Sequence, residues 1–404
     1  MASSTTSPST PLPDARRRFP ALAADAAYLD GAGGSQTPQE VLDAVSECMR
    51  ESNANLGGAF PTSGRAVEIM ERGRAAAADF TGADPEGIAF GANMTTLNFL
   101  LAHAVARTLS PGDEIIVTAL DHDANISPWL LIAGDRDLVV RQAPIRADDV
   151  TLDHDALEEL IGDRTRVVAF TLASNAVGSL TDPARIAAAA HRVGALAWAD
   201  AVHLAPHRRL RARDWGLDVL LCSPYKFFGP HLGVAAIRPE LARTLPADRV
   251  RPAPESPSGR RFETGTQSHE AVAGTTAAID YLRSLGDGSL DTSFDRVVEY
   301  EDALSTRFLE GLPEGLELYG LRTSDGRTPT FCFNLAGHTP RELAERLGAQ
   351  GLYVWDGDYY ALEPMRALGL GETGGAVRAG FLHYTTVEEV DRLLEALASL
   401  ADRS

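Results

Sequence analysis

Short apolar runs rich in Val, Ile and Ala alternate with segments of helical period between residues 85 and 240. A strand with one solvent-exposed face alternates apolar and polar residues, whereas a continuous apolar run is typical of a strand buried on both faces of a parallel sheet. We predict strands at 114–118, 138–141, 167–172, 196–200, 219–222 and 234–238, with helices at 95–109, 155–160 and 183–193. This order predicts an α/β large domain with a mainly parallel central sheet.

The pattern changes after a polar, Pro/Gly-rich stretch at 251–261. Segments of helical period follow at 270–285, 294–309, 340–350 and 386–400, and an apolar run at 330–334 predicts a strand. These features predict a smaller α+β C-terminal domain. We therefore expect an N-terminal tail (1–17), a large domain (18–265) and a small domain (266–404).

The composition is that of a globular enzyme and excludes several other classes. Hydrophobic residues make up 44% of the 404 residues, which is enough for a large core. The formal net charge of −19 argues against a surface that binds nucleic acid or an acidic membrane. No apolar run reaches the ~18 residues of a membrane span and the start of the chain lacks a signal core, so we expect a cytoplasmic protein. Cys48, Cys222 and Cys332 lack the spacing of a disulfide framework or a metal site, so we expect reduced thiols and no metal.

Lys226 is the only lysine among 37 basic residues. A bias towards arginine would let a dispensable lysine drift to arginine, so its retention indicates a need for an amine. Lysine can lose its proton and attack a carbonyl to form a Schiff base, which a guanidinium cannot do. Lys226 follows an apolar run, and an amine at the end of a buried strand has a lowered pKa. We therefore predict that Lys226 is a nucleophile and base.

Other polar residues follow the predicted strands, where an open parallel sheet collects its ligands. Asp200 ends a strand, and a buried carboxylate there needs a partner, such as a protonated pyridine nitrogen, a helix N-terminus or another cation. Asn93, Met94 and Thr95 stand between a short apolar run and a helix. Backbone amides at such a helix start can bind a phosphate, although residues of this type often only cap a helix.

Three further residues stand in comparable places. His122 and Asn175 each follow a predicted strand, and His203 lies three residues after Asp200. Each of them alone also fits a structural role. Together with Lys226 and the helix start, they form the set that pyridoxal 5′-phosphate (PLP) requires: an amine for the aldehyde, a carboxylate for the ring nitrogen, a ring that stacks on the cofactor and a phosphate site. The sequence therefore predicts PLP as the cofactor.

Several motifs resemble the class V aminotransferase family of fold type I PLP enzymes, and within it the branch of cysteine desulfurases and selenocysteine lyases. The resemblance covers nearly the whole chain. The motifs are Tyr28-Leu29-Asp30-Gly31-Ala32-Gly33, Asp121-His122-Asp123-Ala124-Asn125, Ser174-Asn175, Ser223 with Lys226, and Phe262-Glu263-Thr264-Gly265-Thr266. The resemblance implies a substrate loop that contains Gly33, a catalytic stacking role for His122, and contacts of Asn175 with both cofactor and substrate.

The resemblance also assigns the remaining site residues. Asp200 would contact the pyridine nitrogen, Ser223 the phosphate, and Lys226 would form the Schiff base. Thr266 would reach the phosphate of the neighbouring subunit, which implies a homodimer with shared active sites. Arg378 falls where the family binds the α-carboxylate of the substrate, to which a guanidinium can donate two hydrogen bonds.

The chain departs from the desulfurase pattern at several of these positions. In desulfurases a mobile loop carries the cysteine that accepts the substrate sulfur as a persulfide, whereas Tyr360 stands at that place here. A phenol cannot hold a persulfide, so we expect no sulfur relay and assign Tyr360 to substrate binding. Tyr225 replaces a histidine, His203 replaces a glutamine, and Asn93-Met94 replaces a threonine pair. We expect these residues still to contact the cofactor.

We predict a PLP-dependent lyase that acts on an amino acid or on an S-conjugate of cysteine. The simplest reaction is β-elimination with carbon–sulfur cleavage, in which Lys226 removes the Cα proton and Asp200 keeps the ring nitrogen protonated. Transamination, decarboxylation-linked deamination and epimerisation are the alternatives among enzymes. A non-catalytic, desulfurase-like binding protein is a further alternative, against which the retained lysine argues.

Overall fold

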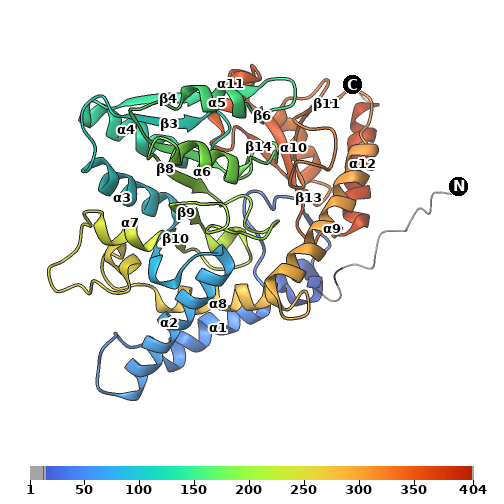
Figure 1. The fold of residues 1–404 in the computed structure, drawn as a ribbon. Helices are drawn as coiled ribbons and strands as arrows, with labels where there is room; N and C mark the ends of the chain where they lie inside the picture. The colour runs from blue at the N-terminus through green and yellow to red at the C-terminus, as the bar shows by residue number, and fades with distance from the viewer. Residues whose placement is uncertain (1–11, 13–14, 403–404) are drawn as a thin grey trace, which may run out of the picture.

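A seven-stranded sheet forms the centre of the molecule (Figure 1). The structure is a computed structural model that describes residue 12 and residues 15–402, so most of the predicted tail at 1–17 lies outside the described residues. The strand order is β2 (Ile88–Gly91), β10 (Gly233–Ile237), β9 (Val219–Cys222), β8 (Leu196–Asp200), β7 (Thr165–Thr171), β3 (Glu114–Thr118) and β4 (Val139–Ala143). The strands from β9 to β4 run parallel, which confirms the prediction of a mainly parallel sheet.

Strand β10 departs from the expected direction, because it pairs antiparallel with both β2 and β9. A parallel return needs a crossover of about a dozen residues or more, usually with a helix. Residues 223–232 join β9 to β10 and contain only the short 3-10 turn Pro224–Lys226. The chain therefore turns back beside β9, and this turn carries Lys226.

Both faces of the central sheet are buried, as the continuous apolar runs predicted. Ile116 of β3 lies in one core, and its neighbours Ile115 and Val117 lie in a second core. This arrangement follows from the alternation of side chains along a strand. The helices in this part of the chain are α3 (Met94–Ala106), α4 (Ser127–Arg136), α5 (His154–Leu160), α6 (Pro183–His191) and α7 (Pro239–Thr244).

Helix α8 (His269–Arg283) packs against both α1 (Gln39–Glu51) and α2 (Pro61–Thr81). These helices form an arm that extends from the body of the molecule, with the α1–α2 connection at its tip (Figure 1). The sequence pattern predicted α8, but it did not predict α1 or α2. Helix α8 begins the predicted small domain and yet packs on helices of the predicted large domain, so the boundary at residue 265 stays a prediction.

A second, four-stranded antiparallel sheet follows in the C-terminal part of the chain. Its order is β11 (Leu316–Tyr319), β12 (Thr330–Leu335), β15 (Ala376–Gly380) and β14 (Trp355–Gly357). The helices of this region are α9 (Leu290–Glu310), α10 (Pro340–Gly348), α11 (Leu362–Ala367) and α12 (Val387–Ala401). Phe308, Phe331 and Phe381 lie in a third core between the sheet and these helices. The structure therefore confirms an α+β arrangement of these residues.

Two pairs of short strands complete the fold. β1 (Ala27–Tyr28) pairs parallel with β13 (Leu352–Tyr353), and β5 (Ile145–Arg146) pairs antiparallel with β6 (Thr151–Leu152). The β1–β13 pair brings the N-terminal substrate-loop motif next to the C-terminal segment that contains Tyr360. Within the part of the chain that the structure describes, no helix is both long and apolar enough to cross a bilayer.

Candidate active site

Lys226 ends the turn that follows strand β9. Its Nζ donates hydrogen bonds to the carbonyl oxygens of Ala32, at 2.7 Å, and Gly33, at 2.9 Å. Burial and, to a lesser extent, Arg378 lower the pKa of Lys226 to about 7, against the opposite effects of Asp200 and Asp30. A large share of this amine is therefore uncharged at neutral pH, as a nucleophile or base requires.

Asp200 is the last residue of β8 and is 3% exposed. Its Oδ1 accepts a hydrogen bond of 2.8 Å from the backbone amide of Val202. Burial raises the pKa of Asp200 to about 6, against the effect of that hydrogen bond and of Lys226. Among the described residues, no cationic side chain lies within ion-pair distance of this carboxylate. A buried carboxylate in this state is suited to a cationic ligand group such as a protonated ring nitrogen.

The start of helix α3 lies next to the turn that carries Lys226. The backbone amide of Met94 donates to the Oγ of Ser223 at 3.1 Å, and the side chain of Asn93 caps the helix by accepting from the amide of Thr96 at 2.8 Å. A side chain at Gly233 would place its Cβ 2.4 Å from the carbonyl carbon of Asn93, so β10 passes close to this helix start. Backbone amides and a serine hydroxyl gathered at a helix N-terminus are suited to a phosphate.

Two neighbours of this helix start are uncharged donors. The hydroxyl of Thr95 contacts the sulfur of Met94 at 3.6 Å. The ring of Tyr225 stacks on His231 with centroids 5.0 Å apart, and burial raises the pKa of the Tyr225 phenol. Tyr225 is therefore a neutral hydroxyl at physiological pH, where the resembled family has a histidine.

His122 lies in the turn after β3, and the buried carboxylate of Asp121 stabilises this turn. Its Nδ1 accepts a hydrogen bond of 3.0 Å from the amide of Ala124, so the neutral ring carries its proton on Nε2. Burial, with Lys226 and Arg378, lowers the pKa of His122 to about 4. Asp121, which is fully buried, accepts from the Asn125 side chain at 2.7 Å and fixes this turn. His122 is thus a neutral ring in a fixed place, as stacking on a cofactor requires.

Asn175 and Arg378 meet at the edge of the site. The Nη1 of Arg378 donates to the carbonyl oxygen of Asn175 at 2.8 Å, and its guanidinium lies 4.3 Å from the centroid of the Tyr359 ring. The Asn175 amide donates to the carbonyl oxygen of Tyr359 at 2.9 Å, while its Oδ1 is buried without a hydrogen-bond partner in the described structure. A buried guanidinium beside an unpartnered acceptor is suited to a ligand that brings both a carboxylate and a donor group.

His203 lies in the loop after β8 but directs its Nε2 to the C-terminal sheet. This atom is 3.0 Å from the Thr330 hydroxyl and 3.2 Å from the Thr328 hydroxyl. A second histidine, His207, packs edge-on against it and pairs with Glu301 at 2.8 Å. The predicted contact of His203 with the cofactor stays a prediction, and these partners leave only its Nδ1 for that contact.

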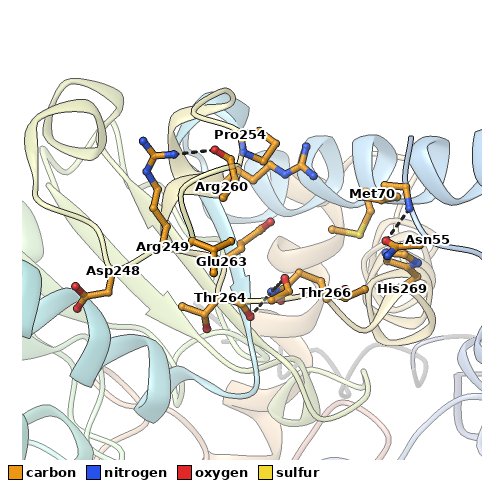
Figure 2. Close-up of a pocket in the computed structure, with 15 residues that line it drawn as sticks. Asn55, Met70, Asp248, Arg249, Pro254, Arg260, Glu263, Thr264, Thr266 and His269 are labelled. Atoms are coloured by element: carbon orange, nitrogen blue, oxygen red, sulfur yellow. Dashed lines mark hydrogen bonds between the residues drawn. The ribbon is translucent and has the colours of Figure 1, made fainter. Parts of the chain in front are cut away.

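Thr266 does not lie with the other predicted cofactor residues. It lines a cavity of about 540 Å³ with Asn55, Met70, Arg249, Arg260 and His269 (Figure 2). None of the other predicted cofactor-binding residues lines this cavity. Glu263 holds the segment in place, because its carboxylate pairs with Arg74 at 2.7 Å and accepts from the amide of Phe90 at 3.0 Å.

Tyr360 lies in the segment that follows β14 and is 69% exposed. Its ring centroid lies 5.5 Å from that of His122, so the structure brings it to the predicted stacking residue. The described cysteines Cys48, Cys222 and Cys332 are all buried and lie outside this segment. The position therefore offers a phenol and no thiol.

Sequence reasoning gave no role to Asp30 and Trp355. Burial raises the pKa of Asp30, while Arg378 and Lys226 lower it, so this carboxylate lies in the field of both cations. Trp355 lies against Gly33, where an added Cβ would come within 2.4 Å of the indole nitrogen. The pairing of Trp355 with Arg378 across two strands has no local sequence signal, whereas Asp30 stands inside the motif Tyr28-Leu29-Asp30-Gly31-Ala32-Gly33.

These residues fit PLP. Among the described residues, Asp200 has no cationic side chain within ion-pair distance and Asn175 has a buried acceptor without a partner, and the helix start at Asn93 gathers donors for a phosphate. Lys226 supplies an amine with a pKa of about 7 in the same place.

Comparison with known proteins identifies the family. The class V aminotransferase family matches residues 27–393. An aminotransferase-like protein of Gibberella zeae is 32% identical over 396 residues, which cover 95% of this chain and 96% of that protein. A cysteine desulfurase of Pectobacterium carotovorum is 31% identical over 411 residues, which cover 96% and 98%. The apo structure of a cysteine desulfurase from Thermococcus onnurineus has a TM-score of 0.91 at 28% identity and covers 100% of both chains.

The chain belongs to the class V aminotransferase family. Within this family it is a cysteine desulfurase-like enzyme. The predictions of the fold type I architecture and of PLP as cofactor are confirmed, since the family and the matched desulfurase structures are PLP-dependent. The roles of individual site residues stay predictions.

Proposed function

We propose that this protein is a PLP-dependent lyase that cleaves the carbon–sulfur bond of a cysteine S-conjugate by β-elimination. The single observation that supports the proposal is the buried Lys226 amine, whose pKa is lowered to about 7 and which donates hydrogen bonds to the Ala32 and Gly33 carbonyls. The desulfurase relatives support carbon–sulfur chemistry, and the phenol of Tyr360 in place of a thiol argues against persulfide transfer.

The residues divide into those that hold the cofactor and those that hold the substrate. Lys226, Asp200 and His122 would hold the PLP ring, and the start of α3 at Asn93–Thr95 with Ser223 and Tyr225 would hold its phosphate. Arg378 and Asn175 would bind the α-carboxylate of the substrate, beside Gly33 and Tyr360. When bound, PLP supplies an electron-accepting ring for the electron pair left at Cα.

Lys226 removes the Cα proton, and the Cα electron pair then forms the Cα–Cβ double bond as the Cβ–S bond breaks. The sulfur leaves with that bonding pair as a thiolate and takes a proton. Water hydrolyses the unsaturated product to pyruvate and ammonia, so the reaction needs no oxidant. Asp200 keeps the ring nitrogen protonated throughout, and Arg378 fixes the substrate by its carboxylate.

We further propose a homodimer with shared active sites. Thr266 lines a cavity apart from the other predicted cofactor residues of its own chain, and Figure 2 shows its side chain beside those of Asn55 and His269. A second subunit would use this face to complete its own site. Sedimentation analysis of the protein and of Thr266→Ala, with cofactor content measured in parallel, tests the arrangement.

One assay tests the reaction. The PLP-loaded protein is incubated with a panel of amino acids and cysteine S-conjugates, and pyruvate, ammonia and thiol are quantified. Equal amounts of pyruvate and thiol are expected. Release of a keto acid without thiol would favour transamination, and absence of any product with bound cofactor would favour a binding protein.

A further inference from the structure

Two exposed aromatic side chains contact residues of the predicted site. Exposed large apolar groups that gather at one place can mark a binding surface. Trp355 is 51% exposed and Tyr360 is 69% exposed. Both belong to the segment 353–360, which begins with the last residue of the short strand β13 and contains β14. The two rings therefore come from one segment, and they contact different residues of the site.

Trp355 lies beside the predicted carboxylate-binding residue. In the antiparallel pair of β14 and β15, Trp355 is directly opposite Arg378, and directly opposed residues point to the same face of a sheet. The indole also contacts Gly33, whose carbonyl oxygen accepts from the Nζ of Lys226 at 2.9 Å. A substrate held by Arg378 next to Lys226 thus has the indole at its side.

Tyr360 lies against His122, with the two ring centroids 5.5 Å apart and the rings inclined by 39°. Its backbone is fixed, because its carbonyl oxygen accepts from the amide of Asp123 at 2.8 Å and that of Tyr359 accepts from Asn175 at 2.9 Å. Tyr359 and Tyr360 both have a φ of 56°, a left-handed conformation that persists only where the surrounding contacts hold it. The backbone that carries the phenol is therefore held in place beside His122.

A carboxylate lies beside Tyr360, whereas Trp355 stands opposite the cation Arg378. The Oδ1 of Asp358 accepts from the amide of Tyr360 at 2.9 Å, and this carboxylate acts on the pKa of His122. An acidic substrate side chain would meet this charge, whereas a flat apolar group would bury ring surface against both aromatic faces.

We propose that Trp355 and Tyr360 form an aromatic clamp that selects amino acids with a large apolar or aromatic group beyond Cβ. The proposal rests on the proposed function, in which the preferred substrates are aryl or long-chain alkyl thioethers of cysteine. The clamp gives Trp355 and Tyr360 a role in substrate specificity. The elimination reaction itself does not require this role, because it acts equally on a small thioether.

The test compares S-benzyl-L-cysteine with S-methyl-L-cysteine on the PLP-loaded enzyme. The wild-type kcat/KM for the benzyl compound should exceed that for the methyl compound by about tenfold or more, as expected for several buried carbon atoms. Trp355→Ala and Tyr360→Ala should each reduce this ratio, mainly through KM. Trp355→Leu, which keeps an apolar side chain, should reduce it less than Trp355→Ala.

Tyr353→Ala is the matched control, because Tyr353 is 41% exposed on the same segment but packs edge-on against Tyr28. It should keep the wild-type ratio. Equal wild-type kcat/KM values for the two thioethers, or an unchanged ratio in both clamp variants, would overturn the clamp.

A binding measurement separates the clamp from the reaction. L-Homophenylalanine and L-2-aminobutyrate carry no leaving group, so calorimetric titration reports affinity without elimination. Tighter binding of L-homophenylalanine that is lost in Trp355→Ala supports the clamp even if no thiol is ever released, in which case only the proposed reaction fails. Equal binding of the two ligands overturns the clamp even if thiol release is observed.

Discussion

The backbone amide of Asp123 donates a hydrogen bond of 2.8 Å to the carbonyl oxygen of Tyr360. This bond ties the segment after β14 to the turn that presents His122. A second bond, from the Asn175 side chain to the carbonyl oxygen of Tyr359, holds the same segment. The resemblance to desulfurases would instead imply a mobile loop at this place, which carries the substrate sulfur. We infer that the segment in this chain is a wall of the site and not a carrier.

Sulfur transfer to the protein should therefore not occur. After incubation with cysteine, alkylation and peptide mapping should find no persulfide on Cys48, Cys222 or Cys332. Burial raises the pKa of the Cys332 thiol to about 12 and raises those of Cys48 and Cys222, so their thiolate fractions at neutral pH are small. A persulfide on any of the three would restore the desulfurase interpretation.

Replacement of Lys226 by alanine should abolish turnover and covalent attachment of the cofactor, because the chain has no other side-chain amine. Borohydride reduction followed by mass spectrometry measures the attachment. Lys226→Arg serves as the control, since it keeps a cation but no nucleophile and should fail equally. A cofactor adduct on any other residue would contradict the assignment.

Asp200→Asn should leave the cofactor bound but reduce the rate by several orders of magnitude. An amide cannot stabilise a protonated ring nitrogen as a carboxylate does, and an unprotonated ring is a poor electron acceptor. Absorbance gives the cofactor content, and thiol release gives the rate. Near wild-type turnover in a fully loaded variant would reject the role of Asp200.

Incorporation of PLP by the apoprotein should depend on pH with a midpoint of about 7, the lowered pKa of Lys226. The uncharged amine is the nucleophile, so the rate should be low below this pH and reach a plateau above it. Arg378→Gln removes a charge that lowers the pKa of Lys226, so its midpoint should move to higher pH. A stopped-flow series measures both curves, and a wild-type midpoint near the ordinary value of about 10.4 would refute the argument.

Glu263→Ala should destabilise the protein by about 3–5 kcal/mol, because it leaves the Arg74 guanidinium buried without its partner. It also removes the acceptor for the amide of Phe90 in β2. Denaturant unfolding measures the change. Arg243→Ala breaks a solvent-exposed pair with Glu240 and should have almost no effect. Equal stability of the two variants would show that the buried pair contributes nothing.

The central strands could be predicted well from the sequence. The predicted strands 114–118, 196–200 and 219–222 coincide with β3, β8 and β9, because strands buried on both faces are continuous apolar runs between polar segments. Helices α1 and α2 were not predicted from the sequence. Much of each helix faces solvent on the arm, so its many charged residues obscure the periodic pattern of its apolar residues. The antiparallel direction of β10 was also not predicted, because the direction of a strand depends on the connection before it, here residues 223–232, and not on the strand itself.

Site residues could be predicted only where they stand at the ends of strands whose order along the chain matches their order in the sheet. Lys226, Asp200 and His122 each follow a central strand, and parallel strands bring their carboxyl ends to one edge. Trp355 has no such signal, because its partner Arg378 is set by the register of β14 and β15. His203 was assigned from its spacing and from the family resemblance, and neither could reveal the hydroxyls of Thr328 and Thr330 that hold it.

The hydrogen bonds of the Lys226 amine to the Ala32 and Gly33 carbonyls have a practical consequence for labelling. Amine-directed reagents such as succinimidyl esters react with exposed lysines throughout most proteins, but this chain has a single lysine side chain. Acylation of Lys226 requires the segment at Ala32 and Gly33 to release the amine. The yield of the acylated peptide over time therefore reports how often the active site opens, and bound cofactor or substrate should suppress that signal without any engineered probe.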